Sequence, residues 1–350
     1  MEQTVRVALD AMGGDYAPLE VVKGAAEAVN AHPELVVTLV GREEEIRAEL
    51  AKYTYREEQI SVVNATEVIG CDEAPVEAVQ RKRDSSIRVA MNLVRHGDCD
   101  AFVSAGSTGA VLVGGRILVG RIPGVERTPL APLIPTERGV SLLIDCGANV
   151  DARASQLVQF AVMGSIYMKY VVGVENPTVG IVNIGVEEEK GNALVKETYP
   201  LLKARTDINF IGSVEAREIP RGAADVIVCE AFVGNVILKL YEGLAGTLLD
   251  KIKEGLMSTA RSKIGAALAK PALKKTLKGF DTSEYGGAPM LGLNGLVVKT
   301  HGNSTSVEIR NALAQCIAFQ QEDIIGKIRE GLGNAGPEKT AEQTGVKGDA

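Results

Sequence analysis

Tryptophan is absent from this 350-residue sequence, histidine occurs three times, and aromatic residues make up only 4% of the chain. The formal net charge is −7. Proteins that bind nucleic acid generally need a basic surface and stacking rings, so we expect no nucleic-acid partner. The histidines, at positions 32, 96 and 301, lack the spacing of metal ligands, and we predict no metal site.

Paired cysteines and long apolar runs are also missing. The five cysteines are scattered without a CxxC pair, which is typical of structural thiols in a reducing cytoplasm. The first ten residues enter a strand-like run and carry Glu2 and Arg6, so we expect no signal peptide. Because no uninterrupted apolar run reaches ~18 residues, we expect no membrane span.

Two nucleotide-binding signatures do not occur. No GxGxxG lies near the start of the chain, and no GxxxxGK(S/T) occurs anywhere in it. A dinucleotide site or a P-loop would therefore lack its usual sequence pattern. We predict that the protein works without a cofactor.

The chain is otherwise rich in alternating strand-like and helix-like segments, with 45% hydrophobic and 24% charged residues. The expected strands are 5–9, 35–40, 61–64, 140–145, 178–184, 208–211, 226–229 and 296–300. The expected helices are 18–31, 43–52, 87–96, 155–172, 192–204, 235–256 and 304–330. Such alternation favours parallel strands joined by helical crossovers, and so an α/β fold of three layers (α/β/α) with a mostly parallel sheet.

The domain organisation follows from the same pattern. We expect one large α/β unit over residues 1–332, with a helical protrusion at about 246–280. Residues 333–350 are rich in Gly, Lys, Glu and Thr, and we expect a disordered tail there.

The first candidate binding site is the turn at 104–109. An apolar run at 101–104 leads into its Ser, Gly and Thr residues, which open a helical segment. A strand, a Gly-rich turn and a helix start present backbone N–H groups to an anion, and Ser107 and Thr108 add hydroxyl donors. The alternative is a tight strand-to-helix turn without a ligand, and the turn alone does not decide between them.

Similar polar turns follow four further apolar strands. All five are rich in Gly, Asn, Ser or Asp, and they lie at 10–15, 104–109, 145–151, 183–192 and 230–235. Open parallel sheets bind ligands beyond the carboxyl ends of their strands. We therefore expect these turns to face one cleft.

A basic segment breaks the overall acidity of the chain. Residues 250–279 carry eight Lys or Arg and two acids, with apolar residues between them. An anionic membrane or an acidic protein would fit this segment, and so would a solvated face above a core stripe. The predicted contact residues are Arg261, Lys263, Ile264, Leu268, Leu273 and Lys274. Pro271 predicts two short helices, or a helix and a loop.

Several motifs together resemble the bacterial phosphate acyltransferases, the PlsX family. They run in order along nearly the whole chain, and the opening Asp-Ala-Met-Gly-Gly-Asp is the most specific of them. The matching segments are 8–15, 82–86, 103–106, 108–110, 145–149, 183–185, 190–192, 232–235, 285–289 and 301–302. Ser107, Val186 and Glu230-Ala231 depart from the family pattern, where we expect Asn, an acid and Asp-Gly.

The resemblance implies an enzyme that transfers a fatty acyl chain from acyl carrier protein to inorganic phosphate, giving acyl phosphate for phospholipid synthesis. It also implies a fold similar to the isocitrate/isopropylmalate dehydrogenase type and a homodimer. The enzyme would be cytoplasmic and peripherally associated with the membrane, where a membrane acyltransferase uses the product on glycerol 3-phosphate. Acyl carrier protein is acidic, so a basic docking patch is expected at 81–83 or 261–278.

The chemistry needs a positioned phosphate and donors for the thioester oxygen, but no covalent nucleophile, because phosphate is already an anion. The resemblance makes Lys190 the leading candidate for the cation, with a surface lysine paired to neighbouring acids as the alternative. Phosphate or substrate would be bound by Gly13, Gly14, Ser104, Gly106, Ser107, Thr108, Gly109 and Asn149.

Further catalytic candidates carry amide or imidazole groups. Asn192 and Asn235 are interpreted as donors to phosphate or the thioester oxygen, and helix N-caps are the alternative for both and for Asn149. His301 would protonate the leaving thiolate or bind an oxyanion, unless it is structural. For Cys146 we favour packing over nucleophilic catalysis.

Three other functions compete with this interpretation. A phosphotransacetylase acting on short acyl-CoA and a dehydrogenase of the same fold type are the enzymatic alternatives. A membrane-docking adaptor built on the basic segment is the third. Such an adaptor would not require five polar turns at one sheet edge, so these turns argue against it.

Overall fold

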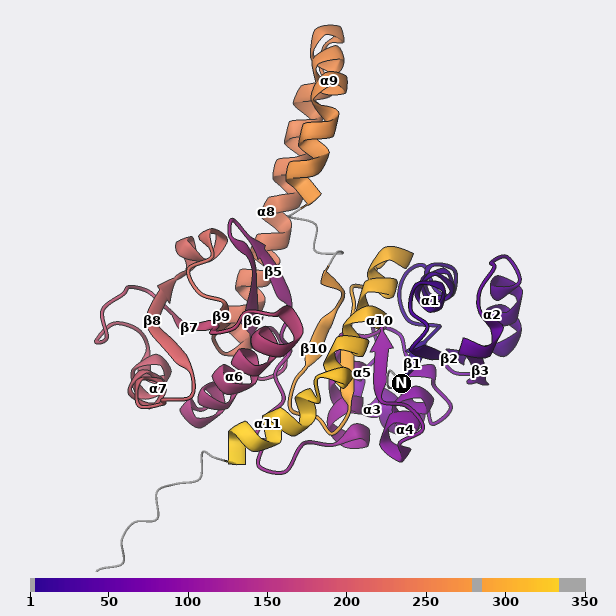
Figure 1. Cartoon of the computed structure of the whole chain (residues 1–350), viewed down its shortest axis with the longest axis horizontal. Coiled ribbons are helices and arrows are strands. Elements are labelled where there is room, and N and C mark those ends of the chain that lie inside the picture. Colours follow the sequence, from indigo (N-terminus) through magenta and orange to yellow (C-terminus); the bar gives the residue numbers. More distant parts are fainter. Residues whose placement is uncertain (1–3, 279–284, 334–350) are drawn as a thin grey trace, which may run out of the picture.

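The computed structural model describes residues 4–278 and 285–333, and it contains two mostly parallel sheets (Figure 1). The first sheet has the order β10 (Ala288–Met290), β11 (Leu296–Lys299), β4 (Ala101–Ser104), β1 (Val5–Asp10), β2 (Leu35–Gly41) and β3 (Ile60–Asn64). The second has the order β5 (Leu133–Thr136), β6 (Gly139–Ile144), β9 (Val226–Val228), β7 (Thr178–Asn183) and β8 (Asn209–Glu215). Only the edge strands β10 and β5 pair antiparallel among these described strands.

Helices link and cover the strands. Those nearest the first sheet are α1 (Leu19–Ala31), α2 (Glu43–Leu50), α3 (Pro75–Arg81), α4 (Ser86–His96), α5 (Thr108–Gly114) and α10 (Ser306–Gln321). The others are α6 (Ala154–Tyr167), α7 (Ala193–Lys203), α8 (Ala231–Met257), α9 (Ala260–Lys278) and α11 (Ile324–Gly333). Short helical segments lie at Glu57–Gln59, Gly115–Val119, Met168–Val172 and Ala216–Arg221.

The first sheet is buried on both faces, as the alternation of its side chains shows. Val7 and Leu9 of β1 belong to one apolar cluster, on the side of α1 and α10, whereas Ala8 between them belongs to another, on the side of α4. Successive strand residues point to opposite faces, so helices on both sides must cover them. The expected α/β fold with mostly parallel strands is confirmed.

The second sheet is layered in the same way. Leu142 and Ile144 of β6 face α6, and Leu143 faces the opposite side, where Ile237 and Leu238 of α8 pack. Burial of both faces explains why these strands appear in the sequence as nearly continuous apolar runs.

One apolar cluster joins the two sheets. Leu9 of the first sheet and Phe160 of α6 both belong to it, and both are fully buried. An isolated bridge between Leu130 and Met290 adds a backbone link between the two halves. The two sheets therefore share one core.

Helices α8 and α9 form an antiparallel hairpin that projects from the body (Figure 1). Pro271 lies inside α9, so the predicted break of the segment at this proline is wrong. The missing N–H of a proline costs a hydrogen bond but does not have to end a helix.

By length and composition alone, α8 meets the criteria for a membrane span, although no span was expected from the sequence. Its first turns nevertheless pack against the second sheet, where the Tyr241 hydroxyl donates to the Pro135 carbonyl. The charged pair Lys239 and Glu242 also interrupts its apolar surface. These contacts place the start of α8 on the protein body.

Two other element predictions need correction. The single expected helix over 304–330 is two helices, because Asp323 adopts a left-handed conformation (φ 45°) between α10 and α11. The helix expected at 235–256 begins earlier, at Ala231, so Asn235 lies in the second turn of α8. Glu230 is the N-cap of this helix, and its carboxylate accepts from the backbone N–H groups of Phe232 and Val233.

Candidate active site

A cleft of about 510 Å³ lies between the two sheets, at the carboxyl ends of β11 and β6. Thr108 reaches it from the start of α5, and Gly147 and Val150 from the turn after β6. Its other polar lining residues include Asn235, Lys239, Glu242, Tyr285, Lys299, Thr300 and His301. Three of the five predicted polar turns therefore contribute to one cleft.

Lys299 is a cleft residue that the sequence analysis did not identify. It is 8% exposed, and burial lowers the pKa of its ammonium group from 10.5 to about 8. The ammonium donates to the carbonyls of Ala105, at 3.3 Å, and Thr300. A lysine inside the apolar strand Leu296–Lys299 was the available signal, because an unpaired charge is costly to bury.

Two buried polar atoms in the same cleft have no hydrogen-bond partner among the described residues. They are the hydroxyl oxygen of Thr300 and one carboxylate oxygen, Oε1, of Glu242. Buried polar groups are nearly always satisfied, and leaving one unpaired costs about 1–3 kcal/mol. Together with Lys299, these atoms mark a polar site that a ligand would complete.

His301 faces the carboxylate of Glu242 across the cleft. Its Nε2 lies 3.6 Å from Glu242 Oε1, while Lys239 on the same helix pairs with Glu242 Oε2 at 2.7 Å. His301 lies two residues after the end of β11, and α8 supplies the orienting carboxylate. An imidazole held by a carboxylate at a cleft is suited to proton transfer.

Comparisons with known proteins show the family of this chain. The family model described as "Fatty acid synthesis protein" matches residues 5–327. The phosphate acyltransferase of Clostridium acetobutylicum is 48% identical over 93% of this chain and 98% of its own length. That of Clostridium beijerinckii is 49% identical over 93% of this chain and 98% of its own. The chain belongs to the phosphate acyltransferase family.

Solved structures show the same fold at low sequence identity. A phosphotransacetylase from Streptococcus pyogenes superposes with a TM-score of 0.62 at 18% identity, covering 91% of this chain and 94% of that one. A phosphotransacetylase from Staphylococcus aureus gives 0.58 at 18% identity, with the same coverage. These structures show the fold, and the phosphate acyltransferase relatives show that the chain is a transferase. Both the family and the fold were recognised from the sequence.

The turn after β1 and the Gly-rich turn after β4 pack directly against each other in this phosphate acyltransferase. The Ser104 hydroxyl donates to Asp10 at 2.6 Å and accepts from the Gly106 N–H at 2.9 Å. A Cβ at Gly13 would lie 2.5 Å from Asp10 Oδ2 and 2.6 Å from the Gly106 nitrogen. Glycine is needed at position 13 because the two backbones touch.

The remaining residues of these turns are divided between structural contacts and the cleft. Ser107 caps α5 by accepting from the Ala110 N–H, and a Cβ at Gly109 would lie 2.4 Å from Pro75. Gly14 has a positive φ of 101° and packs on Ala105. Only Thr108 among the predicted residues of this turn lines the described cleft, and phosphate binding by the others stays a prediction.

Asn149 is buried and uses its amide in a network. It donates to Asp145 at 2.7 Å and to the Thr128 carbonyl at 3.1 Å, and its oxygen accepts from Arg116. Because its donors and its acceptor are all engaged, Asn149 orients Arg116 in this structure.

The other predicted asparagines lie in two different places. Asn235 lines the cleft, from the second turn of α8. Asn192 caps α7 by accepting from the Val195 N–H at 2.9 Å, and it lies beside a separate apolar groove of about 310 Å³. The alternative of a helix N-cap therefore holds for Asn192 and fails for Asn235.

Lys190 is not among the described residues that line the cleft. It lies in the loop after β7, with 49% of its side chain exposed, and its ammonium pairs with Glu187 at 2.8 Å. This pairing raises the pKa of Lys190. The structure does not bring Lys190 together with His301, and its catalytic role stays a prediction from the family motif.

Cys146 is a buried thiol at the cleft wall. Its Sγ donates to the Leu143 carbonyl at 3.2 Å, and burial raises its pKa well above the usual value. A thiol held protonated is a poor nucleophile, which agrees with the packing role favoured for Cys146.

The predicted membrane or carrier-protein contacts lie on α9, away from the cleft. Ile264 and Leu268 are 65% and 80% exposed, and Arg261 and Lys263 are exposed beside them. Leu273 is half-buried on the same helix, and the side chain of Lys274 lies outside the described residues.

Proposed function

We propose that this phosphate acyltransferase transfers a fatty acyl group from acyl carrier protein to inorganic phosphate, and that the acyl phosphate feeds phosphatidic acid synthesis. A phosphate oxygen attacks the thioester carbonyl, the C–O bond forms, the C–S bond breaks, and the carrier's thiol leaves with a proton. The observation that carries this proposal is one cleft that holds the buried ammonium of Lys299, the buried hydroxyl of Thr300 and the exposed imidazole of His301. Among the described residues, the Thr300 hydroxyl has no hydrogen-bond partner.

Each of these residues has a role in the step. The Lys299 ammonium attracts the phosphate in a site of low dielectric, where charge interactions are strong. The Thr300 hydroxyl donates to phosphate or to the thioester oxyanion, which satisfies its missing hydrogen bond. His301, oriented by Glu242, protonates the leaving thiolate.

The decisive experiment mixes the protein with inorganic phosphate and palmitoyl-acyl carrier protein, and detects acyl phosphate by trapping with hydroxylamine. A parallel reaction supplies acetyl-CoA, the donor of the competing phosphotransacetylase activity. We expect product from the carrier-protein donor at a kcat/KM at least about tenfold higher. Product from acetyl-CoA alone, or none from either donor, would contradict the proposal.

For the carrier protein itself, the exposed hairpin offers the better basic surface. Arg81 and Lys82 are already paired with Glu77 and Glu73, at 2.5 and 2.7 Å. Arg261 and Lys263 on α9 are exposed, and no ion pair engages them within the described residues. We therefore assign the docking of the acidic donor to the hairpin, near its membrane contact.

The hairpin also supports a peripheral membrane role, since the product would be passed to a membrane acyltransferase that acts on glycerol 3-phosphate. Basic residues beside exposed Ile264 and Leu268 suit an anionic bilayer surface. The double variant Ile264→Glu/Leu268→Glu should lose sedimentation with phosphatidylglycerol vesicles while activity on soluble substrates persists. Val76→Glu, an equally apolar exposed site on α3, is the matched control. Unchanged sedimentation of the double variant would refute the membrane contact.

A homodimer would cover the apolar stripe of α8. Phe232, Val236, Leu240, Leu244 and Leu248 recur at every fourth position, and each is at least half exposed. Such a stripe is costly in water and typical of a helix–helix interface. Leu244→Glu should shift the mass measured by light scattering from two chains to one. A monomeric wild-type protein would contradict this assignment.

A further inference from the structure

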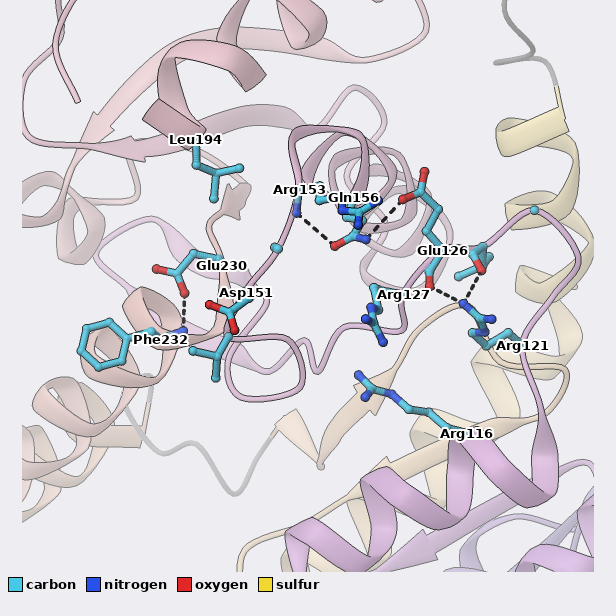
Figure 2. A pocket seen from close by; sticks show the side chains of 14 residues that line it. Arg116, Arg121, Glu126, Arg127, Asp151, Arg153, Gln156, Leu194, Glu230 and Phe232 are labelled. Carbon is cyan, nitrogen blue, oxygen red and sulfur yellow. Dashed lines mark hydrogen bonds between the residues drawn. The ribbon is translucent and has the colours of Figure 1, made fainter. Parts of the chain in front are cut away.

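A second and larger cavity, of about 1360 Å³, opens beside the cleft and is lined by four arginines. Arg116 lies just after α5, Arg121 and Arg127 lie in the segment that leads to the second sheet, and Arg153 lies at the start of α6. Figure 2 shows the side chains of Arg116 and Arg127 reaching toward each other from opposite walls. Elements of both halves of the molecule thus bring guanidinium groups to one place.

The position of Arg116 is fixed by its contacts. Its guanidinium donates to the Ala148 carbonyl at 2.9 Å and to Asn149 Oδ1 at 2.5 Å, and Asn149 is in turn held by Asp145. Burial, and then the positive charge of Arg127, lower the pKa of Arg116. Two guanidinium groups that repel each other in a partly buried cavity would be stabilised by an anion between them.

Carboxylates in the same cavity do not neutralise the arginines. Glu126 accepts hydrogen bonds from Ser155 and Gln156, and Glu230 is engaged as the N-cap of α8. Asp151 also lines the cavity. Within the described part of the chain, no ion pair joins any of the four arginines to a carboxylate. An incoming anion would therefore displace no carboxylate from these guanidinium groups.

The arginine cavity borders the cleft. Val150 and Phe232 line both, so a ligand that extends past these two side chains reaches from the arginines to His301. The donor of the proposed reaction has this shape, because a pantetheine chain separates its thioester from a phosphate group.

We propose that the arginine cavity binds the phosphate of the donor's 4′-phosphopantetheine arm, while the thioester lies in the cleft. Arg127 and Arg116 hold the phosphate from opposite walls, and Arg153 adds a third cation from the second half of the molecule. This inference rests on the proposed function, and it assigns donor recognition to residues separate from those that hold the phosphate acceptor.

The experiment compares two donors that differ only in this phosphate, palmitoyl-4′-phosphopantetheine and palmitoyl-pantetheine. For the wild-type protein we expect kcat/KM to be on the order of tenfold to a hundredfold higher with the phosphorylated donor, as hydrogen bonds to charged groups permit. Arg127→Gln should reduce this ratio to within a few-fold of one. Arg47→Gln, on α2 and paired with Glu43, is the matched control and should keep the wild-type ratio.

Three outcomes would overturn the assignment. The first is an unchanged ratio in both Arg127→Gln and Arg153→Gln. The second is a raised KM for inorganic phosphate with the ratio preserved, which would place the acceptor among the arginines. The third is a loss seen only with palmitoyl-acyl carrier protein or only with palmitoyl-CoA, because the phosphopantetheine arm is common to both.

Failure of the proposed function itself is distinguishable. If no donor yields acyl phosphate, isothermal titration with 4′-phosphopantetheine and with pantetheine still tests the cavity. Tighter binding of the phosphorylated compound, lost in Arg127→Gln, would support the site, and equal binding of the two would refute it.

Discussion

Lys299 and Lys190 both follow strands of parallel sheets, yet the structure places them in opposite environments. Lys299 is buried at the end of β11, bonded to two carbonyls, and its pKa is lowered to about 8 by burial. Lys190 is half exposed in the loop after β7, and its pairing with Glu187 raises its pKa. An exposed, paired charge is screened by water, whereas a buried one without a carboxylate partner keeps its attraction for an anion.

The largest effect is expected for Lys299→Met, which keeps the volume of the side chain and removes its charge. We expect kcat/KM for phosphate to fall by about 10²–10³-fold, as for the loss of one preorganised electrostatic group. Steady-state kinetics with varied phosphate measure it, and Lys52→Met, at an exposed site on the surface, is the control. Near wild-type kinetics in a folded Lys299→Met protein would contradict the assignment of Lys299 as the cation that attracts phosphate.

His301→Gln tests the proton donor that lies beside Lys299. Removal of a general acid should lower kcat by about 10²-fold with an alkyl thioester. A donor with an aryl thiol, which leaves without a proton, should recover most of this loss. Equal losses with the alkyl and the aryl donor would show that His301 does not protonate the leaving group.

Lys190→Ala tests whether the exposed lysine of this pair contributes to activity. If the loop stays as the structure shows it, the loss in kcat/KM should be about tenfold or less, because a paired surface charge contributes little. Glu187→Gln, which frees Lys190 from its partner, should not lower activity. A loss larger than that of Lys299→Met would mean that the loop after β7 closes over the cleft, and would reverse the comparison.

The smallest effect is the pH dependence of the wild-type protein. Lys299 loses its charge as the pH rises through about 8, so kcat/KM for phosphate should decline above that pH. Stability should respond in the opposite direction. Between pH 8 and 10.5 the unfolded chain binds the proton more tightly than the native one, so the free energy of unfolding should rise with pH. Lys299→Met should abolish both trends in rate profiles and in urea titrations.

Much of the fold could be predicted because local pattern and tertiary burial agree. The strand at 5–9 and the helix at 87–96 appear as β1 and α4, and Gly97 ends α4 in the left-handed conformation. The edge strands β5 and β10 and the short helix α3 were missed. These are brief elements whose pairing depends on distant partners, such as β10 with β11.

The candidate site was predicted only in part, for a physical reason. The turns that contribute to the cleft were recognisable because Gly, Asn and Ser follow apolar strands. Lys299 was missed because it ends a strand pattern, and its burial and its hydrogen bond to the Ala105 carbonyl appear only in the structure. The arginines of the second cavity are spread over nearly forty residues and have no common motif.

The sequence by itself determined the family, the α/β class and the strands whose ends carry polar turns, because periodicity and motifs are local properties of the chain. Only the tertiary structure decided which turns pack on each other and which face the cleft. Ser104 and Gly106 bond to residues of their own layer. Thr300 and Glu242 each keep one buried oxygen that has no hydrogen-bond partner among the described residues. Burial and the pairing of charges depend on contacts between distant segments, and these set the pKa of Lys299 and the position of Arg116.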